Sequence, residues 1–131
     1  MPSILGAEKV VVQQAADFAK RFGLSFDRIE DLKTAVAEAC INAIEHGNKF
    51  DRHKKVDVSF LIDDSALRVV VRDMGKGIDP AKIPTQRTDR NGFPLRRGYG
   101  VFLIRSFVNE FSFAAKPEGG NAVTMTIDLE N

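Results

Sequence analysis

Residues 38–47 have the sequence EACINAIEHG, and this segment gives the strongest indication of how the chain folds. Their apolar side chains recur every three or four positions, which predicts a helix with one buried side. Glu38 and Asn42 are four residues apart, so they are neighbours on the surface of that helix. A carboxylate can accept a proton from a reacting group, and an amide oxygen can ligate a hard cation such as Mg²⁺. Most such pairs are only part of a solvated helix surface, so their meaning depends on the rest of the chain.

The helix that contains this stretch is predicted to start near Ser25, a good N-cap, and to stop at Gly47-Asn48 after running to about His46. Its buried side is expected to hold Ile29, Leu32, Val36, Ala39, Cys40 and Ala43. Its polar side is expected to hold Asp31, Glu38, Asn42, Glu45 and His46. An earlier helix is predicted from about Ala7 to Phe22, where Gly23 ends it.

Alternating apolar and polar residues predict four strands, at about 56–62, 67–72, 111–115 and 123–129. The first two are joined by the turn Asp63-Asp64-Ser65, and a short helix is expected from Tyr99 to about Val108. The order αα-ββ-loop-α-ββ predicts an α+β fold, a two-layer sandwich with helices on one face of a mostly antiparallel sheet.

Two glycine motifs flank a long basic loop. Asp73-x-Gly75-x-Gly77 follows the second predicted strand, and Asp73 is in phase with its inward-facing residues, although a buried carboxylate needs a partner. Gly98-x-Gly100 leads into a helix start, where free backbone N–H groups favour an anion. The loop between them carries five basic residues against one acid, which suits phosphate groups: Lys82, Arg87, Arg90, Arg96 and Arg97 against Asp89.

Length and composition narrow the function classes. The 131 residues predict a single domain, 1–131, and the net charge of +1 gives no sign of direct nucleic-acid or membrane-surface binding. The single Cys40 excludes an internal disulfide framework and a cysteine-rich zinc site, and two histidines poorly support a histidine metal cluster. No apolar run approaches the roughly 20 residues of a membrane span. We expect a cytoplasmic protein.

Taken together, these motifs resemble those of the GHKL ATPase superfamily over roughly residues 8–129. Glu38 and Asn42 match its N box, Asp73-x-Gly75-x-Gly77 its G1 box, and Gly98-x-Gly100 its G2 box. Within the superfamily the chain is most similar to the bacterial anti-sigma factor serine/threonine kinases. Three stretches carry this likeness: residues 38–47, Ile78-Asp79-Pro80, and residues 100–105.

The resemblance implies an ATP-dependent serine/threonine protein kinase. Asp73 would receive the adenine amino group, with Gly75 and Gly77 shaping that side of the pocket. Asn42 would ligate Mg²⁺ on the phosphates, and Glu38 would be the catalytic base for a serine or threonine hydroxyl. Gly98 and Gly100 would face the phosphates, and residues 79–98 would form the ATP lid.

The resemblance also implies two protein partners, a small anti-sigma-factor antagonist as substrate and an RNA polymerase sigma factor. The chain departs from the family at two points. Asn121 and Ala122 follow Gly119-Gly120 where a threonine near the nucleotide is usual. Only Ile4-Leu5 is available where members usually begin with an edge strand, which leaves a homodimer through that edge open.

Two other functions fit the same motifs. One is the ATPase domain of a histidine kinase, although no helical hairpin with a phosphoacceptor histidine precedes the motifs. The other is a nucleotide-gated protein-binding module without kinase activity. The presence of Glu38 is only weak evidence against this second alternative. Acid-stable phosphoserine, acid-labile phosphohistidine or no transfer would distinguish the three.

Overall fold

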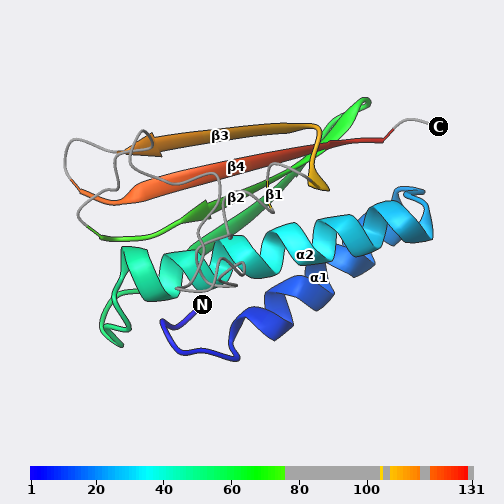
Figure 1. Cartoon of the computed structure of the whole chain (residues 1–131). Helices are drawn as coiled ribbons and strands as arrows, with labels where there is room; N and C mark the ends of the chain where they lie inside the picture. Colours follow the sequence, from blue (N-terminus) through cyan, green and yellow to red (C-terminus); the bar gives the residue numbers. More distant parts are fainter. Residues whose placement is uncertain (76–103, 105–106, 116–118, 130–131) are drawn as a thin grey trace, which may run out of the picture.

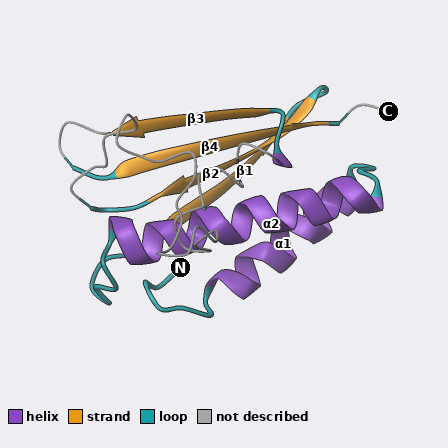
Figure 2. Cartoon of the chain, viewed as in Figure 1, coloured by secondary structure: helices purple, strands orange, loops and turns teal. Residues whose placement is uncertain are grey.

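Two helices pack on one face of a four-stranded sheet in the computed structural model of the chain, which describes residues 1–75, 104, 107–115 and 119–129 (Figure 1). The helices are α1 (Glu8–Arg21) and α2 (Phe26–Asn42). The strands are β1 (Asp57–Ile62), β2 (Ala66–Arg72), β3 (Glu110–Ala115) and β4 (Asn121–Asp128). Figure 2 shows the helix layer and the strand layer separately, which confirms the predicted two-layer α+β fold.

The sheet has the order β1-β2-β4-β3, and each neighbouring pair is antiparallel. The two central strands therefore run in opposite directions, so that the end of β2 lies beside the start of β4. Arg72 pairs with Ala122 at this point. The order of strands thus brings residues 73 and 121, far apart in the sequence, to one end of the sheet.

The second helix differs from its prediction at its C-terminal end. Ser25 is the N-cap as expected, its Oγ accepting a hydrogen bond from the Arg28 backbone N–H at 3.3 Å. Regular α-helix ends at Asn42, however, and the chain continues as a π-helix, η1 (Ala43–Gly47), in which the Asn48 N–H donates to the Ala43 carbonyl at 2.8 Å. The wider turn changes the rotation per residue. Glu45 is consequently buried, and its predicted place on the exposed polar side was wrong.

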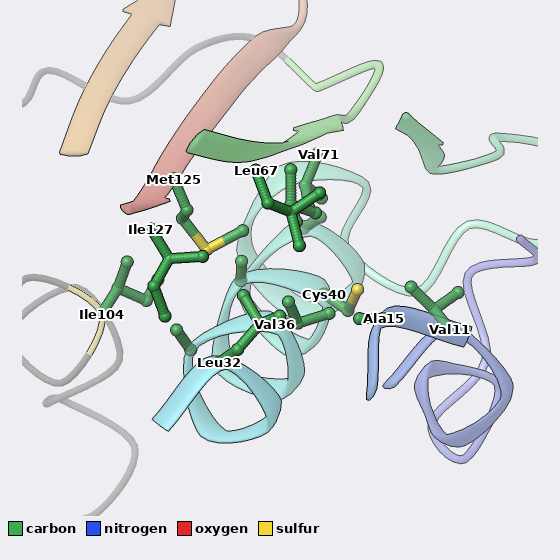
Figure 3. Close-up of a cluster of buried hydrophobic side chains, with 14 of the residues drawn as sticks. Val11, Ala15, Leu32, Val36, Cys40, Leu67, Val71, Ile104, Met125 and Ile127 are labelled. Atoms are coloured by element: carbon green, nitrogen blue, oxygen red, sulfur yellow. The ribbon is translucent and has the colours of Figure 1, made fainter. Parts of the chain in front are cut away.

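The core lies between the helices and the sheet and holds α2 against the two central strands (Figure 3). Side chains of α2 interlock there with those of β2 and β4, and α1 closes the outer side of α2. Burial of this apolar surface fixes where the C-terminal end of α2 lies relative to the end of β2. The labelled members are Val11, Ala15, Leu32, Val36, Cys40, Leu67, Val71, Ile104, Met125 and Ile127.

Three further features bear on the predictions. The segment before α1 makes one isolated antiparallel bridge, between Pro2 and Lys55, and forms no named strand within the described residues. The helix predicted from Tyr99 to Val108 lies mostly outside the described residues. In the part of the chain that the structure describes, neither helix is long and apolar enough to cross a membrane.

Candidate functional site

Three chain segments meet at one end of the molecule, on the left in Figure 1: the end of α2 with η1, the end of β2, and the start of β4. Gly47, Asp73 and Asn121 are the residues at which they touch. Asp73 directly follows β2 and is half-buried, and its backbone N–H extends the ladder by donating to the Asn121 carbonyl at 2.9 Å. The prediction that Asp73 is in phase with the core side of β2 therefore describes its position well.

Two donors hold the Asp73 carboxylate. Its Oδ1 accepts hydrogen bonds from the Gly75 backbone N–H at 2.8 Å and from Asn121 Nδ2 at 3.1 Å. The same amide nitrogen lies 3.4 Å from Oδ2. These contacts supply the partners that a carboxylate in this position needs. Each carboxylate oxygen has further lone pairs that these donors do not occupy.

Glycines allow the three segments to approach this closely. A Cβ on Gly47 would overlap the Asp73 carboxylate, and a Cβ on Gly75 would overlap the Gly47 carbonyl. A Cβ on Gly120 would lie 2.6 Å from the Asp73 carbonyl oxygen, and Gly120 itself has a φ of +94°, which favours glycine. The Gly120 N–H also donates to the Gly75 carbonyl. Gly75 is thus needed for backbone packing before any ligand is considered.

A buried asparagine joins this cluster to the N-terminal segment. The Asn48 side chain, 1% exposed, accepts at Oδ1 from the Met74 N–H at 2.7 Å. Its Nδ2 donates to Ser3 Oγ at 2.9 Å and to the Lys55 carbonyl at 3.2 Å. The backbone beside Asp73 is therefore fixed from two sides, by Asn48 and by Asn121.

Glu38 and Asn42 lie one helical turn apart near the C-terminal end of α2, and both are half-buried. The π-helix η1 follows directly after this pair and ends at Gly47, which touches Asp73. The Glu38–Asn42 pair and the contact with Asp73 thus lie at the two ends of η1, along one continuous helical segment.

The described side chains also fit a magnesium ion whose other ligands are water and phosphate oxygens. Within the described residues, no three histidine, cysteine, aspartate or glutamate side chains gather into a metal cluster. Asn42 offers one amide oxygen, the ligand type that Mg²⁺ takes when water and phosphate oxygens fill its other positions.

The remaining predicted site residues lie outside the described residues: Gly77, Gly98, Gly100 and the proposed lid, 79–98. The sequence did not indicate Gly47 and Asn48 as parts of the candidate site, and it marked Asn121 only as a departure from the family. Asn121 carries the same signal that identified Asp73, because it is in phase with Val123 and Met125 on the core side of β4. Gly47 and Asn48 gave no comparable signal, since both resemble an ordinary helix end.

Comparison with known proteins agrees with this geometry. The sequence pattern of the "Histidine kinase-like ATPase domain" family matches residues 2–127. "Serine-protein kinase RsbW" of Bacillus subtilis (strain 168) is 44% identical over 116 residues, which cover 82% of this chain and 69% of that protein. "Anti-sigma F factor" of the same organism is 30% identical over 115 residues, covering 87% of this chain and 79% of that protein.

A solved structure shows the same fold. "Mycobacterial sensor histidine kinase MprB" superposes with a TM-score of 0.61 at 17% identity, over 92% of this chain and 94% of that chain. The likeness concerns the fold alone, whereas the family match runs through both the Glu38–Asn42 and the Asp73 segments. On the strength of that match, this chain belongs to the histidine kinase-like ATPase domain family, and membership implies that it binds ATP.

Proposed function

We propose that the chain is an ATP-dependent serine/threonine protein kinase that is also an anti-sigma factor. Its protein substrate is a small anti-sigma-factor antagonist, and its second partner is an RNA polymerase sigma factor. Two relatives support this by name, a serine-protein kinase at 44% identity and an anti-sigma F factor at 30% identity. The observation that carries the proposal is structural: α2 holds Glu38 and Asn42 on a helix whose end packs against Asp73.

The adenine end of ATP binds at Asp73. Its carboxylate, held by Gly75 and Asn121, accepts a hydrogen bond from the exocyclic amino group of the base. Gly77 belongs to the same side of the pocket, while Gly98 and Gly100 face the phosphates. Residues 79–98 close over the nucleotide as a lid. The last three roles rest on the family motifs, since these residues lie outside the described part of the chain.

Glu38 performs the proton transfer at the phosphate end. Its carboxylate accepts the proton of a serine or threonine hydroxyl while the hydroxyl oxygen attacks the γ-phosphorus. The bond from that phosphorus to the bridging oxygen breaks, and ADP leaves. Asn42, one turn further along α2, would hold Mg²⁺–ATP through its amide oxygen. When bound, Mg²⁺ neutralises charge on the phosphate oxygens.

Substitution of these two residues separates binding from chemistry. A base typically contributes about 10²–10⁴-fold to rate, so Glu38→Gln should lose at least that order of phosphoryl transfer to a purified antagonist. Its ATP affinity should stay near that of the wild-type chain. Asn42→Ala should lose Mg²⁺-dependent ATP affinity first, because it removes a ground-state ligand. Transfer is measured with labelled ATP, and the product should be acid-stable.

Glu30→Gln is the matched control, because Glu30 is an exposed glutamate of the same helix that forms an ion pair with Lys33, at 3.2 Å. It should transfer phosphate at the wild-type rate. A Glu38→Gln variant as active as the control would contradict the assigned mechanism. An acid-labile product would instead point to a histidine acceptor, and ATP binding without any transfer would favour the nucleotide-gated binding module.

A further inference from the structure

Asn121 has a role at this site that the family motifs do not assign. It is the first residue of β4, 1% exposed, and fixed in the sheet on both sides. Its carbonyl accepts from the Asp73 N–H at 2.9 Å, and its backbone pairs with Ala115 of β3. A side chain so anchored can hold a neighbouring group in one orientation.

The group that it holds is the Asp73 carboxylate. The terminal torsion of an aspartate side chain is broad and roughly two-fold, so a carboxylate without donors turns readily. Asn121 Nδ2 lies 3.1 Å from Oδ1 and 3.4 Å from Oδ2, close to both oxygens at once. The Gly75 N–H donates to Oδ1 at 2.8 Å. Together the two donors fix the plane of the carboxylate.

We propose that Asn121 is the positioning residue that sets the preference of this chain for a base with a 6-amino group. By donating to Asp73 it holds the carboxylate in one orientation, with its remaining lone pairs aimed at one place. Such a carboxylate accepts from the 6-amino group of adenine and repels the 6-oxo group of guanine or hypoxanthine. The inference rests on the proposed ATP binding and adds the residue that makes the binding selective for the base.

Two nucleotides that differ only in the base amino group isolate this effect. Purine riboside 5′-triphosphate has hydrogen where ATP has the 6-amino group. Wild-type chain should bind ATP roughly ten- to a hundredfold more tightly, the range for one hydrogen bond to a charged group. In Asn121→Leu we expect this ratio to fall about three- to tenfold, with little change in affinity for the purine nucleotide. Both affinities are measured by calorimetry with Mg²⁺ present.

The ratio of the two affinities distinguishes positioning from a merely structural role, because damage to the pocket would weaken the binding of both nucleotides equally. Asn121→Thr restores a donor in a smaller side chain and should recover part of the ratio, and it also serves if Asn121→Leu fails to fold. Thr126→Val is the matched control. It removes a buried hydroxyl from the other face of β4, far from Asp73, and should leave the ratio unchanged.

Each outcome bears on one of the two proposals. If the wild-type chain binds neither nucleotide, the proposed function fails. If it prefers ATP and both Asn121 variants keep the full preference, the inference about Asn121 is wrong while ATP binding stands. If the wild-type chain binds both nucleotides equally, the inference is also wrong, because no amino contact exists for Asn121 to position.

Discussion

Asp73 shows how much one side chain can contribute to a site. It touches η1, its own loop and β4, through Gly47, Gly75 and Asn121 respectively. In the proposed function its carboxylate accepts a hydrogen bond from a base amino group, and Gly75 and Asn121 hold it in place. Changes to the Asp73 carboxylate should therefore affect nucleotide binding first, whereas changes at Gly47 and Gly75 should also affect the fold.

Asp73→Asn tests the acceptor directly. An amide keeps the shape of the side chain, but it loses the charge and places an N–H₂ group where the base donates. We expect ATP affinity to fall by about 1.5–3 kcal/mol, the value of a hydrogen bond to a charged group. Calorimetry measures the change, and Asp57→Asn on β1, where the carboxylate is exposed, is the control. Unchanged affinity in a folded Asp73→Asn variant would remove Asp73 from the base-reading role.

Gly47→Ala tests the packing between η1 and the end of β2. The Gly47 backbone is not left-handed, so alanine is acceptable locally, but its Cβ would overlap the Asp73 carboxylate. We expect unfolding free energy to fall by about 1–3 kcal/mol, as in other overpacked sites, and ATP affinity to fall with it.

In an Asp73→Gly background the cost of Gly47→Ala should shrink, because the overlapping atoms are gone. Denaturant unfolding of the two single variants and the double variant gives the coupling between the sites. An equal cost of Gly47→Ala in both backgrounds would mean that Asp73 is not what the new methyl group meets.

At this scale the sequence predicted part of the site. Glu38, Asn42, Asp73 and Gly75 could be found because each belongs to a local pattern, a helix spacing or a strand phase followed by glycine. Asn121 could have been found in the same way. Gly47 and Asn48 could not, because their roles depend on segments that lie far away in the sequence, at Asp73 and at Ser3.

The secondary-structure elements were predicted more completely than the site. Alternation in the strands and the apolar stripe of each helix depend on neighbouring residues, so α1 and the strands β1 to β4 agree with the sequence within two residues at each end. The π-helix was missed. Its hydrogen bond from Asn48 to Ala43 reaches one residue further than in an α-helix, and no local pattern in the sequence indicates that choice.

Ser25→Ala tests how α2 begins. The Ser25 hydroxyl accepts from the Arg28 N–H, and loss of such a cap costs about 0.5–2 kcal/mol of stability. Thr34→Ala, at an exposed position of the same helix, is the control and should be neutral or stabilising, since alanine is the better helix former. Thermal and denaturant unfolding measure both. An equal effect of the two variants would show that the cap does not matter.

Asp63→Asn tests the turn between β1 and β2. The Arg68 guanidinium, 2.7 Å away, together with the Ser65 and Ala66 N–H groups, lowers the pKa of Asp63 far below its ordinary value. A carboxylate with a lowered pKa stabilises the folded chain above the ordinary pKa, and this stabilisation is lost as pH falls through the folded value. The wild-type chain should therefore unfold at a higher temperature than Asp63→Asn at pH 7, and the gap should begin to narrow as pH falls below about 4. A gap that stays constant down to pH 2 would contradict this.

For the molecule as a whole, Cys40 reports on opening of the entire core. It is the single cysteine, fully buried between the two layers, and burial raises the pKa of its thiol to about 12, with the charge of Glu8 adding to the effect. Only the thiolate reacts with disulfide reagents. Native chain at pH 8 should therefore react slowly, at a rate set by unfolding, and denatured chain should react at once.

The same shift gives a pH dependence with a definite sign. Between about pH 9 and 12 the unfolded chain loses the thiol proton while the folded chain keeps it, so stability falls as pH rises through this window. Cys40→Ala should lack this component of the loss of stability at alkaline pH.

Mg²⁺–ATP should slow thiol labelling of the native chain at pH 8, because a ligand that binds only the folded chain reduces opening of the core. Fast labelling of native chain at pH 8 would show that the core opens locally.

The close approach of Gly47, Gly75 and Gly120 has a consequence for how relatives of this chain can be interpreted. Glycine at 75 and 120 is required by neighbouring backbone, independently of any nucleotide. A relative that had lost its activity in evolution but kept this fold would retain those two glycines, while Glu38 and Asp73 would be free to change. If the proposed function holds, the two acidic positions, rather than the glycine motif, distinguish a working enzyme from an inactive relative that keeps only the fold.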